Sequence, residues 1–248
     1  MEKRSLGLSR VWSAGVILPV LTTETFAQTL SLDLGTTGGT TERALQLIAL
    51  ITVLSIAPAI LIMVTSFTRI VVVLSLLRSA IGTQSAPPNT VVVSLALFLT
   101  SFIMAPTIKE IYANSVTPLV QGQIAAEVAF ERATGPIRTF MLTHVREKDL
   151  ELFLDMSGEP RPQSPEVTPL TALTPAFMIS ELRRAFEIGF LLFMPFLIID
   201  LAVASILMAV GMMMLPPTTV SLPFKLIFFV LVDGWSLVAG SLVKSYGL

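Results

Sequence analysis

Long hydrophobic runs alternate with short polar stretches along this chain. The run Ala44 to Val64 carries no charged residue. It is long enough to cross a bilayer as a helix, which takes about 20 residues. A second uncharged run, Ser79 to Ile108, contains the turn sequence Ser85-Ala86-Pro87-Pro88-Asn89. That turn confines the predicted helix to Thr90 to Met104, which is short for a span.

Two later hydrophobic runs each contain one aspartate. Asp200 lies within Ile188 to Val210, and Asp233 lies within Leu226 to Val243. A charged side chain at the bilayer centre costs at least about 2.5–3.5 kcal/mol, so each carboxylate should be neutral, paired or near water. Three interpretations stay open: a proton or ion relay, an aspartyl protease pair, and a structural carboxylate. A structural carboxylate would cap a broken helix or pair with a Lys or Arg of a neighbouring subunit.

The four runs together predict an all-α integral membrane protein of bent helical hairpins. The first hairpin is expected over 44–108 and the second over 175–248. Between the first two runs the only charged residues are Arg69 and Arg78. If the chain starts outside the cytoplasm, the first crossing places these two arginines inside, as the positive-inside rule requires.

The first 27 residues have the pattern of a cleavable signal peptide. Basic residues up to Arg10 precede a short apolar core, Val11 to Leu21, and Thr25-Phe26-Ala27 has the small-x-small pattern of a cleavage site. The alternative is an uncleaved first membrane helix, but the apolar core is too short to span. Residues 28–43 are expected to form a flexible lead.

Charged residues gather in a middle section over 109–174, which is expected on the outer side of the membrane. Gly135-Pro136 is expected to open an amphipathic helix, because proline suits a first helical turn. Its apolar stripe requires a partner surface and comprises Ile137, Phe140, Met141 and Val145. His144 is expected on the solvated face. The segment 159–169 contains four prolines and should be an extended connector.

Thr174-Pro175 is expected to begin a long helix, with Thr174 as its N-cap. Helical spacing places four charged residues on one side: Glu181, Arg183, Arg184 and Glu187. It places the following residues on the opposite side: Met178, Leu182, Ala185, Phe186 and Gly189. Spacing favours two local ion pairs, Glu181 with Arg184 and Arg183 with Glu187. The alternative is an intersubunit charge seam next to the membrane.

Seven residues between the last two runs have unusual chemistry: Gly211, Met212, Met213, Met214, Leu215, Pro216 and Pro217. Gly211 and the two prolines should break the helix and present a loop, which at membrane depth must line a cavity or pack on protein. Methionine side chains are unbranched and adaptable, so they can close around surfaces of varied shape. The pattern predicts a gate.

Composition supports the membrane class and excludes several functions. Charged residues are 13% of 248 and mean hydropathy is +0.81, against roughly 25% charged residues in soluble domains. The net charge of -1 gives no basic surface for nucleic acid. With no cysteine and one histidine, the usual zinc sites are excluded. No catalytic or phosphate-binding motif occurs, so neither enzymatic activity nor a cofactor is expected.

Ordered motifs along most of the chain resemble the FliP family of flagellar export-gate proteins, which are related to the SctR injectisome proteins. The first group of motifs comprises Thr65-Ser66-Phe67-Thr68-Arg69-Ile70, Leu76-Leu77-Arg78, Gly82-Thr83-Gln84, Pro87-Pro88-Asn89 and Leu95-Ala96-Leu97-Phe98-Leu99-Thr100. The second group comprises Pro175-Ala176-Phe177, Ser180-Glu181-Leu182, Ala185-Phe186, Ile188-Gly189-Phe190, Pro195-Phe196-Leu197-Ile198-Ile199-Asp200, Gly211 to Pro217, Leu222-Pro223-Phe224-Lys225 and Leu231-Val232-Asp233-Gly234-Trp235.

The resemblance implies a function that composition does not reveal. Members of this family form a homo-oligomer, usually described as a pentamer, with FliQ and FliR in the inner membrane at the flagellar basal body. Unfolded flagellar subunits pass through this type III export gate, and Met212, Met213 and Met214 match the family's pore gasket. The family complex lies largely on the periplasmic side of the membrane plane. A proton- or ion-coupled transporter that uses Asp200 and Asp233 is the alternative.

Overall fold

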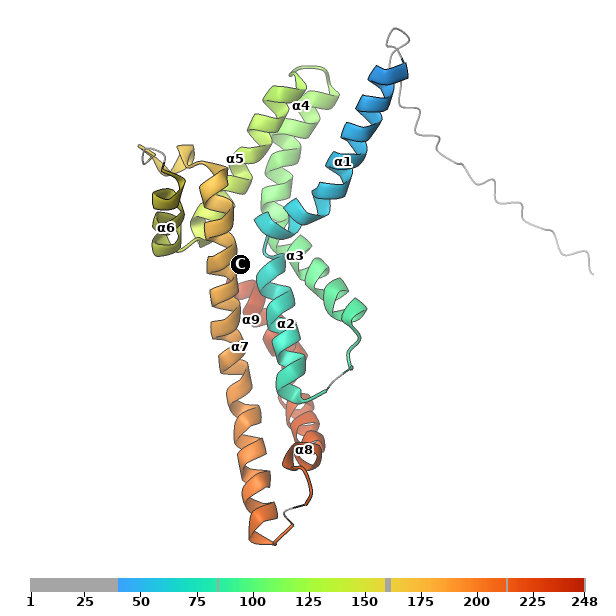
Figure 1. Cartoon of the computed structure of the whole chain (residues 1–248), viewed down its shortest axis with the longest axis vertical. Helices are drawn as coiled ribbons and strands as arrows, with labels where there is room; N and C mark the ends of the chain where they lie inside the picture. Colours follow the sequence, from blue (N-terminus) through green and yellow to red (C-terminus); the bar gives the residue numbers. More distant parts are fainter. Residues whose placement is uncertain (1–39, 84, 159–161, 213, 248) are drawn as a thin grey trace, which may run out of the picture. The chain divides into compact units, whose positions relative to one another are not determined.

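A computed structural model describes residues 40–83, 85–158, 162–212 and 214–247. The predicted signal peptide, nearly all of the predicted lead and Met213 lie outside these residues. The chain divides into two compact units, Met1–Ala49 and Leu50–Leu248, and the packing described below belongs to the second unit. All described secondary structure is helical (Figure 1). The prediction of an all-α fold is confirmed.

The first three helices show where the sequence prediction needs correction. Helix α1 spans Thr40–Val64, α2 spans Phe67–Ile81 and α3 spans Asn89–Ile111. The prediction of a short helix ending at Met104 is wrong, because α3 continues through Pro106. It then runs into a π-helix, Tyr112–Val116, and α4, Thr117–Val120.

The middle section is helical over most of its described length. Helix α5 spans Ala126–His144, so Gly135-Pro136 lies inside it and does not open it. Helix α6 spans Glu147–Ser157, and a short 3-10 turn, η2, covers Pro165–Val167 within the predicted connector. The Ser180 hydroxyl bonds to Asp149 Oδ2 at 2.7 Å and thereby ties α6 to α7.

Helix α7 spans Leu170–Ala209 and continues through Pro175 and Pro195. It therefore begins earlier than the predicted start at Thr174, with Pro169 at its N-cap. The last hydrophobic run divides into α8, Pro217–Leu231, and α9, Gly234–Lys244, which meet at 62°. Three described helices are long and apolar enough to cross a membrane, or up to four spans if this bent pair counts as one.

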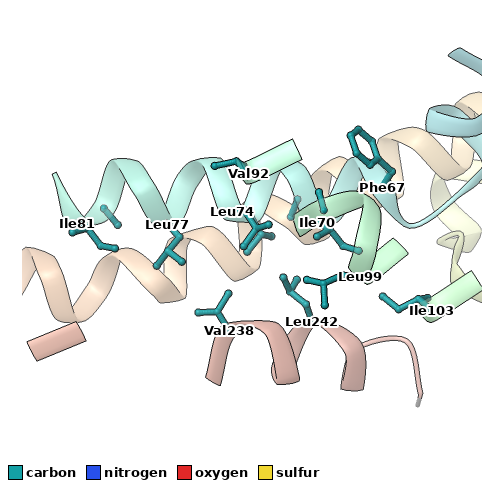
Figure 2. Packing of buried hydrophobic residues seen from close by; sticks show 14 of the residues in the cluster. Phe67, Ile70, Leu74, Leu77, Ile81, Val92, Leu99, Ile103, Val238 and Leu242 are labelled. Carbon is teal, nitrogen blue, oxygen red and sulfur yellow. The ribbon is translucent and has the colours of Figure 1, made fainter. Parts of the chain in front are cut away.

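The main core forms where α2 packs along α7 (Figure 1). Figure 2 shows Val238 and Leu242 of α9 pointing toward Leu74 of α2 and Leu99 of α3. Gly189 permits close approach of α2 and α7, because a Cβ there would lie 2.3 Å from Leu76 Cδ1.

A second, smaller cluster joins α5 to α7. Met141, Leu173 and Phe177 are fully buried, and the remaining residues of the predicted stripe, Ile137, Phe140 and Val145, pack against them. The prediction that this stripe requires a partner surface is confirmed. Together the two clusters hold α7 against α2, α5 and α9, and leave the end of the α7–α8 hairpin outside the core.

Candidate functional site

The methionine loop, residues 210–216, connects α7 to α8. Gly211 adopts a left-handed backbone conformation with φ of 77°, which glycine adopts without a Cβ clash. The Met212 N–H donates to the Leu207 carbonyl at 2.9 Å and so closes the end of α7. Pro216 is the N-cap of α8 and Pro217 is its first residue, where a missing N–H costs nothing. Glycine and prolines therefore shape the loop as the sequence predicts.

The described methionine side chains of this loop are exposed on the surface of the chain. Met212 is 49% exposed and Met214 is 98% exposed. Soft, unbranched side chains of this kind adapt to partner surfaces of different shapes. Clustered exposed apolar side chains mark sites of contact with other protein or with membrane. The loop is therefore available for contacts outside this chain.

Next to the hairpin end, Asp200 of α7 is paired with Lys225 of α8. Lys225 Nζ donates to Asp200 Oδ2 at 2.6 Å and to the Ala80 carbonyl at 3.3 Å. The Ser221 hydroxyl donates to Asp200 Oδ1 at 2.5 Å. Lys225 and Ser221 are buried. Asp200 thus has its cationic partner within the same chain, not on the neighbouring subunit considered from the sequence.

Asp233 lies at the break between α8 and α9. It has a φ of 50° and is the N-cap of α9, but its side chain makes no capping hydrogen bond. Asp233 is exposed, whereas Asp200 bonds to Ser221 and Lys225. The two aspartates therefore lie in different surroundings, and Asp200 has Lys225 as its structural partner.

Glu181, which the spacing places beside Arg184, is fully buried and bonds to Arg69. Arg69 Nε donates to Glu181 Oε2 at 2.8 Å, and Arg69 Nη2 donates to Glu181 Oε1. The Tyr246 hydroxyl also donates to Glu181. Arg69 Nη1 donates to Ser245 Oγ at 3.0 Å, and its guanidinium lies 3.9 Å from the Tyr246 ring centroid.

This buried network corrects two predictions. Arg69, predicted in the connection between the first two hydrophobic runs, lies within helix α2 and is 1% exposed. The predicted Glu181–Arg184 pair is wrong, because Glu181 belongs to the buried face of α7. Phe186, predicted on the apolar side, is 59% exposed. Helical spacing alone does not identify the buried face when that face contains a charged residue.

The other predicted charges lie nearer the surface. Arg183 Nε pairs with Glu187 Oε1 at 3.0 Å, with side chains 58% and 61% exposed, so the i,i+4 pair is confirmed. Arg78 donates to Asn89 Oδ1 at 2.5 Å and to the Pro87 carbonyl, which closes the loop between α2 and α3. An intersubunit role for Arg183 and Glu187 stays a prediction.

His144 is buried, which corrects its predicted place on the solvated face. Its ring lies 4.7 Å from the Phe140 ring and 4.9 Å from the Tyr246 ring, between centroids. Nδ1 donates to the Phe140 carbonyl at 2.8 Å. Burial lowers the pKa of His144 from its ordinary value, and the nearby Glu181 carboxylate partly opposes this effect.

Four partners of these charges did not stand out in the sequence: Ser221, Lys225, Ser245 and Tyr246. Lys225 carried a usable signal, because it is the only charged residue between Asp200 and Asp233. A buried aspartate requires a cation, and this lysine is the nearest one along the chain after it. Tyr246 had no such signal, since it lies 65 residues from Glu181.

Sequence comparison decides the family. The profile of the FliP family matches residues 50–242, which cover most of both hairpins and the methionine loop. The chain belongs to the FliP family.

Curated relatives of this FliP-family chain carry the name flagellar biosynthetic protein FliP. A protein of Caulobacter vibrioides is 58% identical over 234 residues, which cover 94% of this chain and 88% of the relative. A protein of Bacillus subtilis is 55% identical over 201 residues, covering 81% and 91%. A protein of Aquifex aeolicus is 50% identical over 223 residues, covering 89% and 93%.

Proposed function

We propose that this chain is a core subunit of the flagellar type III protein export gate. Several copies, as in the pentamer usual for the family, would assemble with FliQ and FliR around a pore for unfolded flagellar subunits. The family match over residues 50–242 is the observation that carries this proposal. The name shared by the FliP relatives supports its flagellar context.

The methionine loop is proposed as this subunit's share of the pore seal. Met212 and Met214 are exposed at the end of the α7–α8 hairpin, and Pro216 and Pro217 restrict the backbone that follows them. Dispersion contacts between methionines are individually weak and do not require a fixed geometry. A ring of such loops would close around varied polypeptides and reopen at low cost.

The apolar surface that one chain leaves open supports the proposed oligomerisation. In an apolar 18-residue stretch of the candidate span Leu170–Ala209, only 6% of the residues are buried inside the chain. Phe190, Leu191, Ile198 and Leu201 are all more than half exposed. Surface of this kind must be covered by lipid or by protein. Neighbouring copies and the FliQ and FliR subunits are the proposed protein partners, within the basal body.

The proposed location is the inner membrane, with the middle section on the periplasmic side. Helix α5 carries both acidic and basic residues, including Glu131, Arg132 and Arg138, and the sequence around it shows no excess of Lys and Arg. Loops kept in the cytoplasm usually carry such an excess. The absence of such an excess supports a position of the middle section away from the cytoplasmic side.

Replacement of Met212, Met213 and Met214 together by alanine tests the seal. Alanine lacks the thioether stem, so the closed ring would leave a gap while the helices that build the subunit are unchanged. Membrane conductance to ions should rise several-fold in cells that contain the assembled gate. Purification of the gate with FliQ and FliR establishes that assembly is intact.

Met156→Ala is the matched control, since Met156 is 71% exposed but lies in α6, remote from the loop in sequence. Its conductance should equal that of the unchanged chain. Normal conductance in the triple variant, with the gate assembled, would contradict the proposed seal.

A further inference from the structure

A buried lysine of α8 contacts both α7 and the end of α2 within the α7–α8 hairpin. Lys225 is 5% exposed and donates to Asp200 on α7 and to the Ala80 carbonyl on α2. The Ser221 hydroxyl supplies a further hydrogen bond to the same aspartate. We propose that this group, named here the hairpin clamp and comprising Ala80, Asp200, Ser221 and Lys225, positions the methionine loop in its closed arrangement. This inference rests on the proposed gate function.

The contact with Ala80 has a specific physical basis. Helix α2 ends at Ile81, and Gly82 with φ of 89° is its C-cap. The last four carbonyls of a helix lack partners within it, and Ala80 supplies one of them. A cation at a helix C-terminus also interacts favourably with the helix dipole. Lys225 therefore caps α2 from a different helix.

The pairing with Asp200 explains why the lysine can be buried. A buried ammonium requires both an opposite charge and further hydrogen bonds. Asp200 Oδ2 lies 2.6 Å from Lys225 Nζ, and the second oxygen of Asp200 accepts from Ser221. All three elements, α2, α7 and α8, must hold their relative positions for these bonds to form together.

Between the clamp and the methionine loop, many of the described apolar side chains of α7 are exposed. From Asp200 to Ala209, where α7 ends, the helix rises by about 14 Å. Ile206, Met208 and Val210 are all more than 60% exposed. A small rotation at the clamp would therefore be carried to Met212 and Met214. The clamp therefore controls the position of the methionine loop, which lies at the other end of this helical segment.

Lys225→Met in the full gate tests the inference. Methionine has a similar length but neither caps α2 nor pairs with Asp200, so the loop should lose its fixed position. Loss of a hydrogen bond to a charged group shifts an equilibrium by roughly tenfold or more, and ion conductance through the closed gate should rise accordingly. Lys225→Arg should keep conductance low, because a guanidinium can make both contacts. Lys109→Met removes an exposed lysine and should leave conductance unchanged.

Four outcomes decide between the explanations. An assembled Lys225→Met gate that leaks, together with a tight Lys225→Arg gate, supports the clamp. A tight Lys225→Met gate, while the triple methionine variant leaks, overturns the clamp and leaves the seal in place. If neither variant leaks, the proposed seal itself fails, and the clamp fails with it. Equal leakage of Lys225→Arg and Lys225→Met would also overturn the clamp, since the contacts would then not matter.

A second variant covers failure of Lys225→Met to assemble. In Asp200→Asn/Lys225→Met both charges are removed together, so no uncompensated charge stays buried. This double variant should assemble and leak, because the cap on Ala80 is still absent. An assembled and tight double variant would overturn the clamp.

Discussion

Arg69 and Glu181 form an ion pair in which both side chains are shielded from solvent, at 1% and 0% exposed. Each charge is satisfied by several bonds, including those of Ser245 and Tyr246. Removal of one partner of a buried pair leaves the other charge without compensation, which costs about 3–5 kcal/mol. The stability of the chain is therefore highly sensitive to substitution of either residue, whatever the net contribution of the intact pair.

Arg69→Met should lower the stability of the purified gate by about 3–5 kcal/mol per subunit, or prevent its assembly. Thermal unfolding of the gate, or its yield from membranes, measures the effect. Arg183→Met, on α7, is the matched control. Its exposed pair with Glu187 should contribute about 0.3–0.5 kcal/mol. Equal effects of the two substitutions would show that burial of the Arg69 pair is unimportant.

His144 gives the same region a dependence on pH. The charged groups that face it are Glu181, Arg69 and Arg184, and the Tyr246 ring packs on it. Because burial lowers its pKa, His144 gains its proton at a lower pH in the folded chain than in the unfolded chain, which titrates near 6.5. Its contribution to stability is therefore complete above pH 6.5 and is lost as pH falls through the lowered pKa.

Hydrogen exchange of the gate should show this loss. Amides at the end of α5 and in residues 245–246 should exchange faster at about pH 5 than at about pH 7, after correction for intrinsic rates. The His144→Gln variant, which has no titrating group, should show a smaller difference between the two pH values. An equal difference in both proteins would assign the pH effect to another group.

At the scale of helices, the sequence predicted which segments are helical but misplaced several of their ends. Pro106, Pro136 and Pro175 all lie inside helices, although proline usually ends or bends a helix. Packing on neighbouring helices outweighs this local preference, as tertiary context does for helix propensity in general. Arg69 and Glu181 are 112 residues apart in the sequence. An ion pair between such distant residues produces no periodic pattern, so the sequence does not predict it.

The break between α8 and α9 depends on Gly234. A Cβ at this position would lie 2.1 Å from a ring carbon of Phe229, a residue that is itself buried. Gly234→Ala should therefore push the ring from its site and cost about 1–3 kcal/mol. Thermal unfolding of the purified gate checks this.

Gly240→Ala is the matched control in the same helix, because nothing lies within 4 Å of the added Cβ. It should be neutral or should stabilise the gate by about 0.4–1 kcal/mol, since alanine restricts the unfolded chain more than glycine does. A destabilisation as large as that of Gly234→Ala would argue against the close contact with Phe229.

For the whole molecule, the membrane class and the exposed loop could be predicted because both depend on composition and local sequence. The charge-poor runs predict helices for a bilayer, and the three candidate spans agree with them. The polar partners could not be predicted in the same way. Lys225 hydrogen-bonds to Ala80, which lies 145 residues earlier in the sequence. The two residues come into contact only when three helices pack together.

The same long separations impose an order on biogenesis. As the chain is synthesised, Arg69 appears 112 residues before Glu181 and 176 residues before Ser245. Until those residues exist, the guanidinium has to stay hydrated, because an unpaired buried charge is too costly. Helix α2 therefore reaches its final place only after α7 and the turn after α9 have been made. Assembly with other subunits through surfaces built on α2 has to wait for that late step.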